Sequence, residues 1–113
     1  MRRVALILGS IIAMAVAAAP ASAATVTVSV GPSGRLVFSP ANARIHVGDT
    51  VKWVWGSNNH SSTSGSNGTP DHRWNSGVKN KPFTFTFKFT KAGTFHYFCA
   101  VHFWMHGEIK VVK

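Results

Sequence analysis

The sequence contains very little cysteine and few acidic residues. Its 113 residues include one cysteine, Cys99, so the chain cannot form an internal disulfide. The only carboxylate side chains are those of Asp49, Asp71 and Glu108, which disfavours a site for hard cations, because these prefer several carboxylate ligands. Any metal chemistry must therefore come from softer side chains.

Other patterns are missing as well. We find no amphipathic helix, no internal repeat, no second domain and no pattern that places a nucleophile beside a general base. Twelve lysine and arginine residues give a formal net charge of +9, but they are scattered along the chain and form no nucleic-acid-binding motif. The charge indicates a soluble surface that attracts acidic partners.

The N-terminal segment has the composition of a secretory signal peptide. Basic residues 2–3 precede an apolar stretch, Val4 to Ala19, and Pro20-Ala21-Ser22-Ala23 provides a cleavage pattern of small residues. An uncleaved anchor helix is the alternative, but the apolar stretch is short for a membrane span. We predict a signal peptide at residues 1–23 and one mature domain at 24–113, periplasmic or secreted, with a formal charge of +7.

Short strands account for most of the predicted secondary structure. Alternating apolar residues and Gly/Pro/Asn turns predict strands at residues 25–30, 35–38, 44–47, 50–55, 83–90, 94–99 and 108–112. Residues 56–80 are rich in Ser, Asn and Gly and are predicted to form loops. This pattern predicts an all-β fold, an antiparallel sandwich of two sheets.

The lone cysteine lies in a C-x2-H-x2-M segment with His102 and Met105. A compact loop between two strands can bring these three side chains to one point, whereas a strand would turn them to opposite faces. Thiolate, imidazole and thioether form a soft ligand set that suits copper in both oxidation states. Methionine is a poor zinc ligand.

A copper site of this kind needs a second imidazole. His46 and His96 alternate with apolar neighbours and should face outward, and His72 lies in a polar segment. His106 directly follows Met105 and would point away from it. Position therefore favours His60, which follows the apolar strand at residues 50–55.

Two stretches resemble plastocyanin-type cupredoxins. "FSPANARIHVGDTVKWVWGSNNH" resembles the segment that leads to the first histidine ligand, and "AGTFHYFCAVHFWMHGEIKVV" resembles the segment that holds the other ligands. The C-x2-H-x2-M spacing is similar to the short loop of amicyanin. The resemblance implies a Greek-key sandwich of about eight strands and one type 1 copper ion held by His60, Cys99, His102 and Met105.

The resemblance also implies that the edge of the His102 ring emerges through an apolar surface patch. Two positions depart from the family pattern: Ser61 replaces the usual Asn, and Ala100 replaces the usual Ser or Thr, so the bracing between the ligand loops should be altered. Phe103 and Trp104 replace smaller residues and could either form a docking patch or bury the site further.

A copper ion with four protein ligands has no open position for a substrate, so we predict a protein that is not an enzyme. The predicted function is one-electron transfer outside the cytoplasm, by a monomer that serves redox proteins with acidic docking surfaces. Copper storage or delivery through the same ligands is the alternative. A metal-free β-sandwich binding module, with Cys99 as an incidental thiol, is a third possibility.

Overall fold

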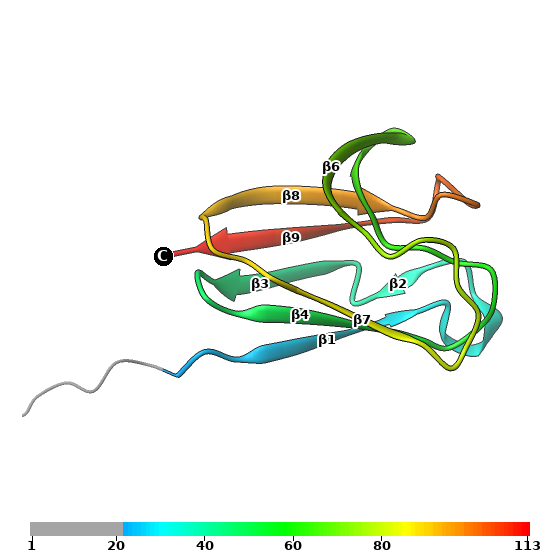
Figure 1. The fold of residues 1–113 in the computed structure, drawn as a ribbon, viewed down its shortest axis with the longest axis horizontal. Coiled ribbons are helices and arrows are strands. Elements are labelled where there is room, and N and C mark those ends of the chain that lie inside the picture. The colour runs from blue at the N-terminus through cyan, green and yellow to red at the C-terminus, as the bar shows by residue number, and fades with distance from the viewer. Residues whose placement is uncertain (1–21) are drawn as a thin grey trace, which may run out of the picture.

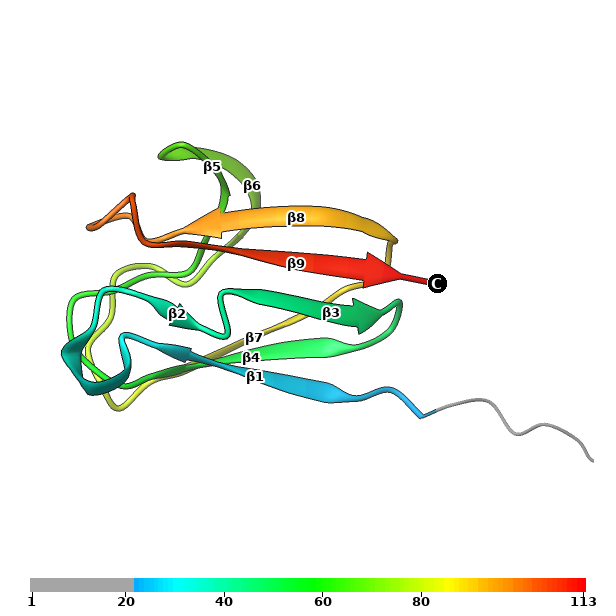
Figure 2. The ribbon, with the colours of Figure 1, turned by 180° about the vertical axis from the view of Figure 1, so that it is seen from behind.

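The computed structural model describes residues 22–113, which form a sandwich of two β-sheets (Figures 1 and 2). The predicted signal peptide lies almost wholly outside the described residues. The elements are β1 (Thr25–Val30), the short 3-10 turn η2 (Pro32–Gly34), β2 (Phe38–Ser39), β3 (Asn42–His46), β4 (Thr50–Trp55), β5 (Thr63–Ser66), β6 (Thr69–Asn75), β7 (Thr84–Lys88), β8 (Gly93–Phe98) and β9 (His106–Val112). Within these residues no helix is long and apolar enough to cross a membrane.

The strand order is β2-β1-β4-β7 in one sheet and β3-β9-β8-β5-β6 in the other. The all-β sandwich is confirmed, but the expectation of purely antiparallel sheets is wrong. β1 pairs with β4 in parallel and β3 pairs with β9 in parallel, so both sheets are mixed. The alternation of apolar and polar residues shows which face is buried and carries no information on strand direction, so the sequence could not reveal these pairings.

Aromatic rings fill the space between the sheets. Trp53 is fully buried and packs against Trp74 and Tyr97, with ring centroids 5.5 and 5.4 Å apart. Apolar side chains from β1, β4 and β9 complete this core. Of the phenylalanines predicted at period two, Phe89 is buried, while Phe83, Phe85 and Phe87 are half-buried against the same core. The pattern thus identified the inward face of β7 correctly.

Residues 56–80 contain more regular secondary structure than predicted: the segment expected to form loops includes the β5–β6 hairpin. Apart from Trp74 and Gly65, the buried residues at this hairpin are serines and a threonine, and side-chain hydrogen bonds satisfy Ser62 and Ser64. The Ser64 hydroxyl accepts from the backbone N–H of Trp74 at 2.9 Å and donates to the Trp74 carbonyl at 3.1 Å. The Trp74 indole N–H donates to the Ser62 hydroxyl at 2.9 Å. A serine-rich strand of this kind has no apolar signal in the sequence.

The loops that concern function gather at one end of the sandwich. The turn after β1, the loop that leaves β4 and the loop between β8 and β9 all lie at the end opposite the C-terminus (Figures 1 and 2). Because β4 and β8 lie in different sheets, this end brings together residues that are far apart in the sequence.

Candidate metal centre

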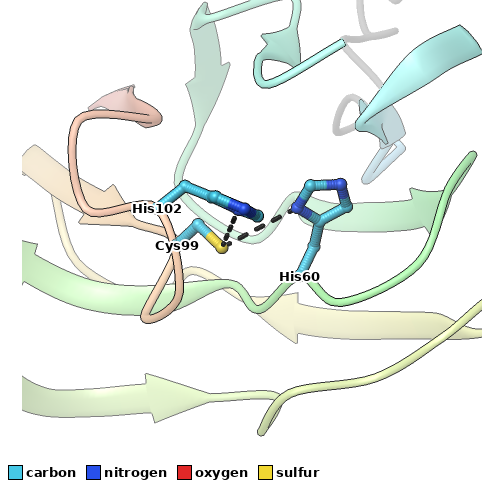
Figure 3. Close-up of side chains that lie close together, drawn as sticks. All are labelled: His60, Cys99 and His102. Carbon is cyan, nitrogen blue, oxygen red and sulfur yellow. Dashed lines mark hydrogen bonds between the residues drawn. The ribbon is translucent and has the colours of Figure 1, made fainter. Parts of the chain in front are cut away.

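Three predicted ligands meet at this end of the sandwich (Figure 3). The Cys99 Sγ lies 3.8 Å from the Nδ1 of His60 and 3.7 Å from the Nδ1 of His102. All three donor atoms lie within 4.8 Å of one another. His60 comes from the loop after β4, and the other two come from the β8–β9 loop, so the site joins the two sheets.

The β8–β9 loop is closed by its own backbone. The Cys99 N–H donates to the carbonyl of Met105 at 2.9 Å, and the Met105 N–H donates to the carbonyl of His102 at 2.7 Å. Met105 is buried, with 1% of its surface exposed, and belongs to the core cluster together with Cys99. The loop backbone therefore holds Met105 close to Cys99, in the same buried cluster.

Ser57 and Gly31 fix the orientation of the His60 ring. The Ser57 hydroxyl donates to the carbonyl of Gly31 at 2.7 Å, so it can only accept from the Nε2 of His60, which lies 2.9 Å away. The Nε2 then carries the proton, and the lone pair of Nδ1 points toward Cys99. A Cβ on Gly31 would clash with this Nε2 and with the Ser57 hydroxyl, and Gly31 also has a positive φ of 62°, so glycine suits this position.

The electrostatics of His60 favour the neutral ring that a metal ligand requires. His60 is 2% exposed, and burial lowers its pKa from the ordinary value. The positive charge that His102 can carry lowers it further. Nδ1 therefore remains free to donate its lone pair at neutral pH.

The bracing between the two ligand loops is present, although its residues differ from the family pattern. The Ser61 N–H donates to the Cys99 sulfur at 3.4 Å, and the Ser61 hydroxyl accepts from the Ala100 N–H at 2.8 Å. Thr63 lies within hydrogen-bond distance of the same hydroxyl, at 2.8 Å. The Ser61 backbone and side chain together tie His60's loop to Cys99's loop. The roles of Ser57, Gly31 and Thr63 could not be predicted from the sequence, because their contacts join segments that meet only in the folded protein.

The other four histidines do not join the cluster found among the described residues. The side chains of His46 and His96 are 68% and 54% exposed, as their outward positions predicted. His72, on β6, and His106, at the start of β9, are exposed too. The selection of His60 from the sequence thus agrees with the geometry.

The donor set fits copper. The three clustered side chains offer one sulfur and two nitrogens, and the nearby Met105 offers a thioether. No carboxylate belongs to the cluster found in the described part of the chain, so the site lacks the oxygen ligands that hard cations prefer. The four side chains have the composition of a type 1 copper site.

Known proteins point to the same chemistry. The family described as "Copper binding proteins, plastocyanin/azurin family" matches residues 24–112. A purple cupredoxin from Nitrosopumilus maritimus is 30% identical over 76% of this chain and 98% of its own, with a TM-score of 0.70. The reduced state of an amicyanin mutant is 22% identical over 77% of this chain and 81% of its own, with a TM-score of 0.63, and shares the fold. No curated protein matches the chain.

The family match spans nearly all the described residues, and its copper chemistry agrees with the buried sulfur and imidazole cluster. The chain belongs to the plastocyanin/azurin family of copper-binding proteins.

Proposed function

We propose that this protein is a one-electron carrier whose copper ion is held by His60, Cys99, His102 and Met105. The observation that carries the proposal is a buried sulfur and imidazole cluster in which only His102 is partly exposed. Copper supplies a change between Cu(I) and Cu(II) when bound. Bracing of the ligand loops would limit rearrangement around the metal, and four protein ligands would leave it no open coordination position for a substrate, which favours electron transfer over catalysis.

His102 is the proposed route for the electron, because it is partly exposed while its Nδ1 lies 3.7 Å from the sulfur of the buried Cys99. Phe103 and Trp104 follow it in the sequence and are 60% and 58% exposed. The ring centroids of His102 and Trp104 lie 5.5 Å apart. Of the two alternatives that the sequence left open for these aromatics, the exposed positions favour docking over burial of the site.

The proposal is tested by redox cycling of the copper-loaded mature domain in the presence of a copper chelator. An electron carrier should change colour reversibly through repeated reduction and oxidation and keep its copper throughout. Rapid loss of copper to the chelator after reduction would instead support storage or delivery. Absorption spectra and the copper content after each cycle distinguish the two functions.

The proposed partners are redox proteins with acidic surfaces, and the proposed location is outside the cytoplasm. Long-range attraction by the basic domain should speed the encounter, and the exposed aromatic pair should then hold the complex. The location is supported by the signal-like composition of residues 1–23, and the resemblance to cupredoxins fits it.

We expect Trp104→Ala to weaken the docked complex with an acidic redox protein by about tenfold, because exposed tryptophans often dominate interface energies. The dependence of the association rate on salt should stay the same, since no charge is removed and screening acts over about 8 Å at physiological ionic strength. Stopped-flow electron transfer at several salt concentrations measures both quantities.

Val47→Ala provides a matched control, because Val47 is exposed and follows β3 at the other end of the sandwich. It should leave the complex unchanged. A larger effect of Trp104→Ala on the copper spectrum than on partner kinetics would contradict a docking role. Rates that do not vary with salt would contradict electrostatic attraction.

A further inference from the structure

Asp49 lies in the turn between β3 and β4, at the end of the sandwich opposite the metal centre. One of its carboxylate oxygens, Oδ1, accepts a hydrogen bond from the backbone N–H of Ala24 at 2.8 Å. The carbonyl of Ala24 in turn accepts from the N–H of Thr50 at 2.9 Å. Both polar backbone groups of Ala24 are thus bound, just before β1 begins its parallel pairing with β4.

The carboxylate of Asp49 is held rigidly. Its Oδ2 accepts from the N–H of His46 at 2.9 Å, its own N–H donates to the His46 carbonyl at 3.0 Å, and its carbonyl accepts from Phe89 at 2.9 Å. The hydrogen bond from Ala24 and then that from His46 lower the pKa of Asp49, so the side chain is ionised at neutral pH. In the folded structure a charged carboxylate oxygen therefore faces the Ala24 nitrogen.

This carboxylate lacks a strong cationic partner. Asp49 is 7% exposed, and buried charges are normally paired. Among the described residues no lysine or arginine forms an ion pair with it, and the nearest basic group is the His46 ring, whose Nδ1 lies 4.0 Å from Oδ2. The two other acidic residues, Asp71 and Glu108, have more exposed side chains and each has a basic neighbour.

We propose that hydrolysis of the Ala23–Ala24 peptide bond creates the missing cation, so that the α-ammonium of Ala24 pairs with Asp49 and locks β1 in place. A peptidase that accepts small residues adds water across this bond. The carbonyl carbon of Ala23 takes the oxygen and leaves as a carboxylate, and the nitrogen of Ala24 becomes protonated. The 2.8 Å contact changes from a neutral donor to a charged one.

Hydration makes the new pair favourable. Ala24 is exposed, so two of the three ammonium hydrogens can remain in water while one binds Asp49. The desolvation cost therefore falls mainly on the carboxylate, which the fold has already buried. The ion pair requires cleavage at the Ala23–Ala24 bond. Cleavage two residues earlier would leave the Ala24 nitrogen as an uncharged amide and place the α-ammonium on Ser22, away from Asp49.

The experiment compares metal-free chains that begin at Ala24 and at Ser22, each with Asp49 and with Asp49→Asn. The shorter chain retains both sheets and the whole of residues 24–112, which match the family. We expect its melting temperature to exceed that of the longer chain by about 4 °C, the shift typical of one modest interaction in a domain of this size. Asp49→Asn should abolish the difference.

Asp71→Asn is the matched control, because it removes the same charge from the exposed strand β6 and should preserve the difference. Acetylation of the Ala24 amine provides a second route if Asp49→Asn fails to fold, and should lower the melting temperature to that of the longer chain. Equal melting temperatures for the two chains with Asp49 would overturn the proposal. So would a difference that persists in Asp49→Asn, or an exported protein whose intact mass shows another first residue.

Discussion

Replacing Cys99 with serine is expected to abolish the intense visible band of the copper(II) protein. That band requires a thiolate ligand, and Cys99 is the only cysteine in the chain. The fold should survive, because serine fills nearly the same volume and its oxygen can accept the N–H of Ser61 that now donates to the sulfur. We expect the metal-free protein to lose about 1 kcal/mol of stability.

Absorption and far-UV circular dichroism of the copper-loaded Cys99→Ser protein measure the two effects separately. Ser62→Ala is a suitable control, since Ser62 is fully buried two residues after His60 but is not a predicted ligand; its hydroxyl accepts from the Trp74 indole. This control should keep its colour at some cost in stability. A visible band that persists in Cys99→Ser would show that another group gives rise to it.

His60→Gly is expected to bleach the site in a way that added imidazole reverses. Loss of the ring opens a space beside Cys99 and leaves the Ser57 hydroxyl without its donor. A free imidazole can enter this space, donate one N–H to Ser57 and direct its other nitrogen toward the metal. The visible spectrum should return in proportion to imidazole occupancy, which absorption titration measures.

Variants of the histidines outside the cluster are the controls, and their absorption spectra are recorded in the same way. His46→Ala, His72→Ala and His96→Ala should each keep the spectrum nearly unchanged without imidazole, because all three side chains are exposed. If His72→Ala bleached the site while His60→Gly did not, the first imidazole ligand would have to be reassigned.

The ligands could be predicted from the sequence because each has a local signal. Cys99, His102 and Met105 share one short segment, and His60 follows an amphipathic strand whose end is easy to place. The residues that support them have no such signal. Ser57 bonds across to Gly31, and Ser61 bonds across to Ala100, so their roles depend on contacts between distant segments.

The fold shows the same division. Apolar alternation located β1, β4 and β7, because burial of one face leaves a period of two in the sequence. Strand direction and the β5–β6 hairpin escaped prediction for different physical reasons. The parallel β1–β4 pairing leaves no trace in the alternation of apolar and polar residues. Ser62, just before β5, and Ser64, on β5, are buried because their hydroxyls bond to Trp74 on β6, a contact that only the folded hairpin creates.

The separation of the ligands along the chain also bears on folding kinetics. His102 is three residues from Cys99, whereas His60 is 39 residues away and approaches only when β5 pairs with β8. An unfolded chain therefore offers the local sulfur and imidazole donors of the β8–β9 segment without the second imidazole. If refolding is started with copper present, the visible band should appear only when β5 pairs with β8. The rate at which the band appears would then report the rate of this long-range strand pairing.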